Sequence, residues 1–330
     1  MARALVPGLA YAAFTRESER VGAAGLSDVA RRLDARADTV FEAASIAKLV
    51  VATSVMQLVE AGALDLEADV SKYVGFAVHH PRWPERITLR LLLTHRASIR
   101  DLGDELTAGA SGNPLGPFLK KYLSRTEAFT AERPGSTLAY SNAGAALAAL
   151  AVERVSGESF VAYSTRRVFT PLRMTRTSWA QPDQPSSGMA TPYGYRDGAF
   201  VALPPPSHAV YPAVDLLATA GDLARFARAI LRGGELDGAR ILSAERVHAM
   251  LRADASASDQ AIGWQLRTIG GRAVIGHEGE DAGATTGLYL DLARGTGALV
   301  LANGDAFGSG DKLRAEAIQT MISELLATTR

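Results

Sequence analysis

A serine and a lysine three residues apart, Ser45 and Lys48, begin a long apolar segment in Phe41-Glu-Ala-Ala-Ser45-Ile-Ala-Lys48-Leu-Val-Val. On a helix this spacing places both side chains on one face, with the ammonium one turn from the hydroxyl. A serine hydroxyl needs a nearby base to become a nucleophile. A lysine serves as that base only when its pKa falls, which desolvation among apolar side chains causes. The pair therefore predicts nucleophilic catalysis.

The same spacing occurs again in Ser309-Gly-Asp-Lys312, just before a predicted C-terminal helix. Serine and aspartate are typical capping residues at a helix N-terminus. We therefore interpret this second copy as a helix start, with Lys312 on a solvated face. Because the pattern is short, the assignment of Ser45 and Lys48 depends on further motifs.

Two further motifs occur once each in the chain. Tyr140-Ser141-Asn142 follows a Pro134-Gly135 turn and directly precedes an apolar helical segment. Gly276-His277-Glu278-Gly279 ends a predicted strand near the C-terminus. In this order and spacing, the Ser-x-x-Lys, Tyr-x-Asn and His-x-Gly motifs resemble the serine β-lactamase and penicillin-binding-protein superfamily. The resemblance covers nearly the whole chain and is strongest to the class C-like branch, which includes D-alanyl carboxypeptidases and family VIII esterases.

This resemblance implies an acyl-enzyme mechanism. Ser45 would attack a carbonyl, while Lys48 and Tyr140 would take its proton and return it to the leaving group. Free lysine and tyrosine both have pKa values near 10, so the base is assigned to the pair rather than to either residue. Asn142 would orient the substrate. The backbone N–H groups of Ser45 and Glu280 would form the oxyanion hole.

The third motif departs from the family pattern. Related β-lactamases usually carry Lys-Thr-Gly where this chain has His277-Glu278-Gly279. We include His277 in the catalytic set and Gly279 among the substrate-binding residues. A histidine is mostly neutral near pH 7, so it lacks the permanent cation that would bind a substrate carboxylate. With Glu278, Glu280 and Asp281 expected at the lip of the cleft, we predict neutral or cationic acyl substrates.

The leading hypothesis is a serine hydrolase that cleaves carboxylic esters or peptide-like amides, with weak β-lactamase activity at most. An acyltransferase or a peptide cyclase would use the same acyl-enzyme, and the sequence does not separate these from a hydrolase. A non-catalytic penicillin-recognising binding module is a third hypothesis. The complete proton-transfer set argues against it, because a binding module needs no such set.

The elements that must position these residues lie at both ends of the chain. Period-two patterns predict strands over 8–14, 39–43, 263–269, 273–277, 286–292 and 298–303, and period-3.6 patterns predict helices over 45–61, 89–94, 117–126, 143–156, 219–231 and 311–328. This order predicts an α+β fold in which N- and C-terminal strands form one antiparallel sheet flanked by helices. We expect a sheet subdomain of residues 1–65 and 216–330, a mainly helical subdomain of residues 66–215, and the active site in the cleft between them.

Composition excludes several classes of function. The 330 residues carry no net charge, which gives no reason to expect a nucleic-acid or membrane partner. The expected partner is the small-molecule ester or amide substrate that the resemblance implies. There is no cysteine, and hence no disulfide or thiolate site. His79-His80 has no carboxylate at ligand spacing, and no nucleotide-binding glycine motif occurs, so we expect neither metal nor cofactor.

Two lesser expectations concern His95 and the N-terminus. His95 lies in a motif that resembles the family, and we expect it to be a structural residue that fixes the loop beneath the cleft. The N-terminal residues lack the apolar core of a signal peptide, so we expect a cytoplasmic protein.

Overall fold

A seven-stranded antiparallel sheet forms the base of the molecule. The computed structural model describes residues 4–106, 114–180, 188–255, 259–307, 310 and 312–329. The strand order is β11-β12-β13-β14-β1-β2-β3, and β1 pairs with β14 in the middle of the sheet, with Leu9 opposite Ala302. The bounds are β1 Gly8–Thr15, β2 Glu19–Asp28, β3 Leu33–Asp34, β11 Gln265–Ile269, β12 Arg272–Asp281, β13 Ala284–Asp291 and β14 Thr296–Ala302. The predicted sheet of N- and C-terminal strands is confirmed.

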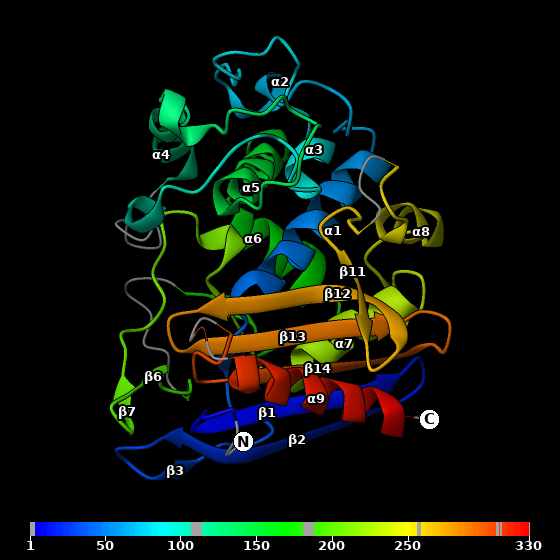
Figure 1. Ribbon diagram of the computed structural model, residues 1–330. Coiled ribbons are helices and arrows are strands. Elements are labelled where there is room, and N and C mark those ends of the chain that lie inside the picture. The colour runs from blue at the N-terminus through cyan, green and yellow to red at the C-terminus, as the bar shows by residue number, and fades with distance from the viewer. Residues whose placement is uncertain are drawn as a thin grey trace.

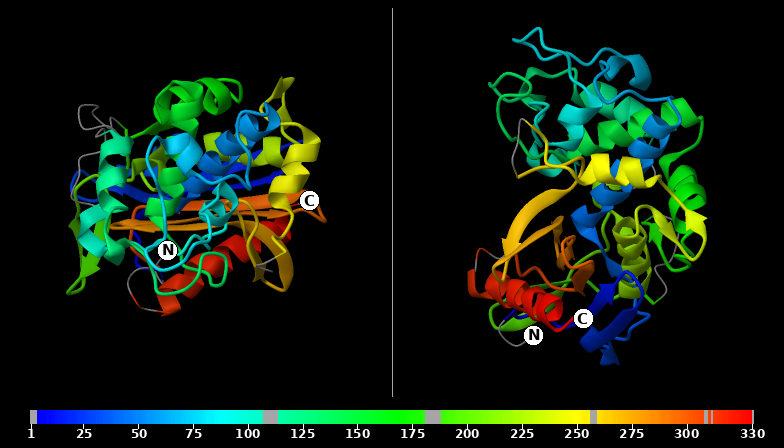
Figure 2. Two further views of the ribbon diagram at one scale, coloured as in Figure 1. Left: turned by 90° about the horizontal axis from the view of Figure 1, so that it is seen from above. Right: turned by 90° about the vertical axis from the view of Figure 1, so that its right-hand side faces the viewer.

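The two faces of the sheet carry different helices. Successive side chains along β1 alternate between faces. Ala10, Ala12 and Phe14 belong to the larger apolar core with α7 (Ala220–Leu231) and α1 (Ala47–Glu60), whereas Leu9 belongs to a second core with α9 (Lys312–Thr328). Figure 2 shows α9 on one side of the sheet and α7 on the other. The predicted α+β sandwich is therefore confirmed.

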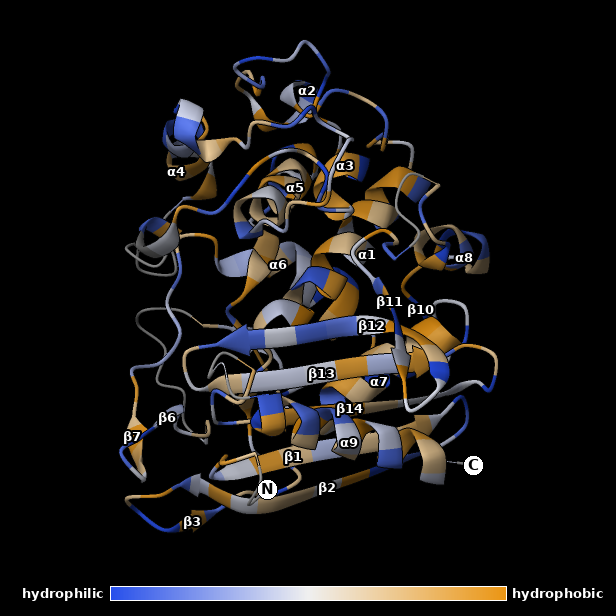
Figure 3. Cartoon of the chain, in the orientation of Figure 1, coloured by the Kyte–Doolittle hydropathy of each residue, from blue (hydrophilic) through white to orange (hydrophobic). Residues whose placement is uncertain are grey.

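The remaining helices cluster above one edge of the sheet (Figure 1). Their bounds are α2 Ser71–Val74, α3 Leu89–Leu93, α4 Leu115–Tyr122, α5 Asn142–Ser156, α6 Phe160–Ser164 and α8 Ala244–Leu251. The helix α5 packs against α1, and both are mainly apolar, whereas α4 and the outer loops carry more hydrophilic residues (Figure 3). Small strands complete the fold: β4 Phe41–Glu42 and β5 Ser178–Trp179 flank β8 Leu216–Ala218, β6 Tyr193–Arg196 pairs with β7 Ala199–Ala202, and β9 Glu235–Leu236 pairs with β10 Ala239–Arg240.

Several element boundaries differ from the sequence prediction. The strand β2 was not predicted, because its Gly-Ala-Ala-Gly centre is rich in small residues and its side chains are not clearly alternating in burial. The predicted strand 273–277 continues to Asp281 as β12. The predicted capping role of Ser309 and Asp311 lies outside the described residues. Within the described part of the chain, no helix is both long enough and apolar enough to cross a membrane.

Candidate active site

The segment that leads into Ser45 has an unusual backbone. The short strand β4 ends at Glu42, and a 3₁₀ turn over Ala44–Ile46 then passes directly into α1. Ala44 has φ of 47°, a left-handed conformation that costs a residue with a β-carbon of order 1 kcal/mol. Ser45 follows in the first turn and is 8% exposed. This turn places the hydroxyl at the N-terminal end of α1, where it meets residues from the helical part of the chain.

Lys48 is a buried ammonium with three hydrogen bonds. Its Nζ donates to Ser45 Oγ at 2.9 Å, to Asn142 Oδ1 at 2.7 Å and to the Ala213 carbonyl at 2.9 Å. The side chain is 2% exposed. Burial lowers its pKa to about 7, although the negative charges of Asp101 and Asp281 oppose this shift. Lys48 therefore exchanges its proton near neutral pH, as the sequence argument required of a base.

Tyr140 contacts the same serine from the opposite side. Its hydroxyl donates to Ser45 Oγ at 2.8 Å, and its ring lies 4.9 Å from Lys48 Nζ. Burial of the hydroxyl raises the pKa of Tyr140 above its ordinary value. The side chain as a whole is 41% exposed, so solvent moderates this shift. Tyr140 is thus a proton donor at neutral pH.

Asp101 holds the Tyr140–Asn142 segment in place. Its carboxylate accepts hydrogen bonds from Ser141 Oγ at 2.9 Å, the Asn142 N–H at 2.8 Å and the Ala143 N–H at 3.1 Å. These groups form the N-terminus of α5, where a negative charge is favourable. Asp101 could not be predicted from the sequence, because it lies 41 residues from Asn142 and belongs to no recognisable motif.

His95 supports the same segment from below. Its Nδ1 accepts the Ser141 N–H at 3.2 Å, its carbonyl accepts the Ala139 N–H, and its ring lies 4.2 Å from that of Tyr140. Burial, together with the charge of Lys48, lowers its pKa well below the ordinary value, so the ring is neutral. These contacts agree with the structural role expected for His95.

His277 lies on β12 across the site. It is 2% exposed, and its ring centre is 6.1 Å from that of Tyr140. Its Nδ1 hydrogen-bonds with the Glu278 carbonyl, while Nε2 has no hydrogen-bond partner among the described residues. Burial, followed by the charge of Lys48, lowers the pKa of His277 to about 3. The side chain is therefore neutral at physiological pH, which supports the inference that this chain lacks the family's cation here.

The end of β12 approaches the nucleophile segment closely. A β-carbon on Gly279 would lie 2.8 Å from the Ala43 carbonyl oxygen and 3.1 Å from Cβ of Ala44, so only glycine fits. Pairing of β12 with β11 ends at Gly276, whereas pairing with β13 continues to Asp281. Among the described strands, the stretch from His277 to Asp281 therefore pairs with β13 alone, and it contacts the turn that carries Ser45. The oxyanion role of Glu280, which belongs to this stretch, stays a prediction.

The expected position of Glu278 at the cleft lip is wrong. Because β12 extends past His277, side chains continue to alternate between faces, and Glu278 points away from Ser45. Its carboxylate lies 3.5 Å from Gln319 Nε2 on α9. Its negative charge also contributes to the raised pKa of Tyr289, which lies in the second core. Asp281, two residues beyond Gly279, shares the face of His277.

Asp281 belongs to a second cluster that the sequence did not reveal. His208, Asp215 and Asp281 bring one ligand-type atom each within 4.8 Å of one another. Asp281 is distant in the sequence from His208 and Asp215, which are seven residues apart, and the residue types of all three recur throughout the chain. The negative charge of Asp281 favours the protonated form, and so a higher pKa, of both His208 and Lys48. The cluster therefore adjoins the nucleophile site.

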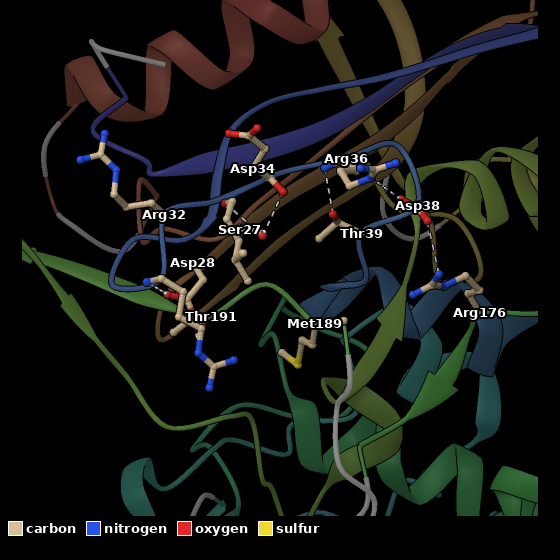
Figure 4. A pocket seen from close by; sticks show the side chains of 13 residues that line it. Ser27, Asp28, Arg32, Asp34, Arg36, Asp38, Thr39, Arg176, Met189 and Thr191 are labelled. Atoms are coloured by element: carbon tan, nitrogen blue, oxygen red, sulfur yellow. Dashed lines mark hydrogen bonds and ion pairs between the residues drawn. The ribbon is translucent and has the colours of Figure 1, made fainter.

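A separate pocket of about 660 Å³ lies between the segments 27–39 and 188–191. Figure 4 shows its charged side chains, which include Arg36 and Arg176 on either side of Asp38. Their nitrogen atoms lie 3.6 and 3.5 Å from the Asp38 carboxylate. None of the predicted catalytic residues lines this pocket, so it is distinct from the site around Ser45.

Comparison with known proteins agrees with this geometry. A family model described as Beta-lactamase matches residues 1–320. Penicillin-binding protein 4 of Amycolatopsis lactamdurans is 30% identical over 319 residues, which cover 91% of this chain and 81% of that protein.

Solved structures share the fold. The octameric penicillin-binding protein homologue from Pyrococcus abyssi superposes with a TM-score of 0.82 at 24% identity, over 99% of this chain and 75% of that one. D-amino acid amidase from Ochrobactrum anthropi, complexed with L-phenylalanine amide, superposes with a TM-score of 0.80 at 21% identity, over 98% and 95%.

Proposed function

The chain belongs to the Beta-lactamase family, and from that premise we propose that it hydrolyses carboxylic esters or peptide-like amides through an acyl-enzyme on Ser45. One observation carries the proposal. Ser45 Oγ lies within hydrogen-bonding distance of both Lys48 Nζ and the Tyr140 hydroxyl, at 2.9 and 2.8 Å. A nucleophile that contacts a titrating base and a proton donor together has what acyl transfer requires.

The two neighbours of Ser45 take different parts in the proton transfer. Lys48, with its pKa near 7, is neutral in a large fraction of molecules and accepts the Ser45 proton as the oxygen attacks. The raised pKa of Tyr140 keeps its hydroxyl protonated, so it donates to the leaving group. In the acyl-enzyme Lys48 is then protonated and Tyr140 is deprotonated. When water attacks the ester, it would give its proton to Tyr140, and Lys48 would return its proton to the Ser45 oxygen as the ester bond breaks.

The developing oxyanion would be bound by backbone N–H groups of Ser45 and Glu280. Gly279 supports this arrangement because its missing side chain lets β12 approach the segment before Ser45. Donors of this kind are each worth about 3–4 kcal/mol to the transition state. Asn142 would orient the substrate with its amide nitrogen, because its Oδ1 accepts from Lys48.

The catalytic residues come from both proposed subdomains, which supports an active site in a cleft between them. Ser45, Lys48 and His277 come from residues 1–65 and 216–330, whereas Tyr140 and Asn142 come from residues 66–215. We keep this division as a proposal. It explains why the catalytic groups meet only when both parts of the chain are folded together.

The substrate class follows from the charge of the site. A neutral His277 provides no cation for a substrate carboxylate, and Asp281 adds negative charge on the same face. Neutral or cationic acyl groups would therefore be preferred, and β-lactam hydrolysis would be weak. A D-amino acid amidase and a D-stereospecific amidohydrolase are among the structures that share this fold, which supports D-amino acid amides as candidate substrates.

The test is a substrate panel with two enzymes. Wild type and Ser45→Ala are incubated with p-nitrophenyl esters of different chain length, D-alanyl amides and nitrocefin. We expect turnover of esters or amides by the wild type alone, and a mass increase on Ser45 in quenched samples. Turnover that survives in Ser45→Ala would refute the proposal, and acylation without turnover would favour the non-catalytic binding module.

A further inference from the structure

One ring nitrogen of His277 is a buried polar atom without a partner. The residue is 2% exposed, and its Nε2 forms no hydrogen bond with any described residue. A polar atom that is removed from water costs free energy unless it gains a hydrogen bond. Native structures keep few such atoms, and a catalytic role or a bound molecule is a common reason for them. Nε2 is thus a candidate contact for the substrate.

The contact at the other ring nitrogen determines what Nε2 can do. Nδ1 hydrogen-bonds with the Glu278 carbonyl oxygen. Because a carbonyl oxygen can only accept, the proton of the neutral ring is on Nδ1. Burial, followed by the charge of Lys48, lowers the pKa of His277 to about 3, so the ring holds no second proton at neutral pH. Nε2 therefore carries a lone pair and accepts hydrogen bonds without donating any.

The lone pair of Nε2 lies on the side of β12 that faces Ser45. Within an imidazole ring Nε2 is remote from Cβ, so it extends away from the backbone of the strand. His277 shares its face of β12 with Gly279, two residues along. That face lies against the nucleophile segment, because a β-carbon on Gly279 would be 2.8 Å from the Ala43 carbonyl oxygen. The acceptor is therefore directed toward the reacting groups.

The donor groups next to Ser45 are already engaged within the protein. The Lys48 ammonium has three hydrogens, and all three are donated. Their acceptors are Ser45 Oγ, Asn142 Oδ1 and the Ala213 carbonyl. The single hydroxyl hydrogen of Tyr140 is donated to Ser45 Oγ. Neither group donates to Nε2, so this acceptor is open to a donor on the substrate.

The leaving atom of the substrate must lie close to His277. In the proposed reaction the Tyr140 hydroxyl gives its proton to the leaving group, so the leaving atom lies beside that hydroxyl. The ring centre of His277 is 6.1 Å from that of Tyr140. An amide nitrogen would receive the Tyr140 proton on its lone pair, while its own hydrogen needs an acceptor. An ester oxygen has no hydrogen and would turn a second lone pair toward Nε2.

We propose that His277 Nε2 accepts the N–H of the scissile amide, which makes this a site for amides rather than esters. The proposal rests on the acyl-enzyme proposed for Ser45 and narrows its substrates to primary and secondary amides. When the C–N bond breaks, the amine leaves with its own hydrogen and with the proton from Tyr140. With an ester, Nε2 stays unpaired and faces a lone pair, which is unfavourable.

Isosteric substrates separate this role from that of Tyr140. D-alanine N-ethylamide and D-alanine ethyl ester differ only by N–H in place of O, and both leaving groups need a proton. His277→Phe removes the acceptor and keeps a ring, so kcat/KM should fall at least about tenfold more for the amide than for the ester. Tyr140→Phe should lower both.

Two further variants control for packing around the ring. His277→Gln offers an amide oxygen near the position of Nε2 and should recover part of the amide activity. His80→Phe makes the same substitution at another buried histidine, whose ring hydrogen-bonds with the Thr130 carbonyl. It should leave the ratio of amide to ester turnover unchanged. Equal losses on both substrates in His277→Phe would overturn the proposal.

The hydrogen bond can also be observed without turnover. Ser45→Ala with ¹⁵N-labelled histidine is saturated with each substrate, and the Nε2 resonance of His277 is recorded by NMR and assigned by its loss when His277→Gln is added. We expect an unprotonated Nε2 in the free protein, a shift with the amide and little change with the ester. That shift without wild-type turnover would refute the proposed hydrolysis alone. An Nε2 resonance that the amide leaves unchanged, or that the ester shifts equally through the ammonium that both substrates carry, would overturn the present proposal.

Discussion

Lys48 Nζ and Asn142 Oδ1 are 2.7 Å apart, the shortest of the three hydrogen bonds that the lysine makes. The contact joins α1 to the N-terminus of α5. It also determines the orientation of the Asn142 amide, because an ammonium can only donate and the amide oxygen must therefore face it. The proton-transfer residues and the predicted substrate-orienting residue thus form one connected network.

The nucleophile prediction compares Ser45, in the turn before α1, with Ser54, which lies farther along that helix. Ser45→Ala should reduce kcat on p-nitrophenyl esters by at least about a thousandfold, because no other group can form the acyl-enzyme. Ser54→Ala is the control, because Ser54 is buried in α1 and its hydroxyl has no hydrogen-bond partner in the part of the chain that the structure describes. Steady-state kinetics of both variants is the measurement. Equal losses in both would indicate damage to α1 and not to the nucleophile.

The pH prediction rests on Lys48. Below pH about 7 its amine is protonated and cannot accept the Ser45 proton, so kcat/KM should fall about tenfold for each further pH unit. Above that value activity should reach a plateau. Lys48→Arg keeps its charge at all these pH values and should be inactive throughout. A pH profile that is flat from pH 5 to 9 in the wild type would contradict the assignment.

The same shift has a consequence for stability, and its sign is determined by linkage. The native pKa of Lys48, about 7, lies below the ordinary lysine value. Between these two values the unfolded chain holds more protons than the native one, so this group's contribution to the free energy of unfolding increases with pH. That contribution is fully present above the ordinary lysine pKa and is lost as the pH falls through about 7. Chemical denaturation at several pH values, compared with Lys48→Met, isolates it.

Tyr140→Phe should separate amides from activated esters. The variant keeps the ring but loses the hydroxyl that bonds to Ser45. Amide leaving groups need a proton, so turnover of a D-alanyl amide should fall about a thousandfold. p-Nitrophenolate leaves without a proton, so ester turnover should fall much less. Equal losses on both substrates would assign Tyr140 to serine activation instead.

Asp101 is predicted to be a positioning residue. Asp101→Ala removes the acceptor of three hydrogen bonds at the start of α5, which should cost about 1–2 kcal/mol of stability. Displacement of Tyr140 and Asn142 should lower kcat about a hundredfold, with less effect on KM. Asp101→Asn keeps one side-chain oxygen and should recover part of the activity. Asp65→Ala, in an exposed turn, is the control.

Substrate charge preference can be tested at His277. His277→Lys introduces the cation that family β-lactamases carry at this position. It should raise relative kcat/KM for carboxylate-bearing over neutral esters about tenfold, the effect of one charge-assisted hydrogen bond of about 1.5 kcal/mol. Glu278→Lys places a lysine on the opposite face of β12 and should leave that ratio unchanged. The ratio measured in both variants is the readout.

The sequence predicted those parts of the site that lie in short motifs at element boundaries. Ser45 and Lys48 share one helix turn, and Tyr140 and Asn142 begin α5, so local spacing was enough to group them. Their mutual contacts, such as Lys48 with Asn142, depend on tertiary packing and came from the family resemblance and the structure.

Two features required the three-dimensional structure. The predicted strand ends at His277, whereas pairing with β13 continues β12 to Asp281. For this reason the prediction put Glu278 on the wrong face of the strand. The cluster of His208, Asp215 and Asp281 combines a loop, the residue before β8 and the end of β12. Nothing in the local pattern of any one of these segments indicates the other two.

The pairing of β1 with β14 also determines when the protein can fold. Leu9 is opposite Ala302. During synthesis on the ribosome, β1 therefore cannot pair with β14 until 293 further residues have been added. At the usual rate of synthesis this delay is roughly 15–60 s. Until then β1 has only β2 beside it, and its open edge is available to other nascent chains. The sheet should therefore be completed only after β14 has left the ribosome, and a chaperone that shields this edge should increase the yield of active protein.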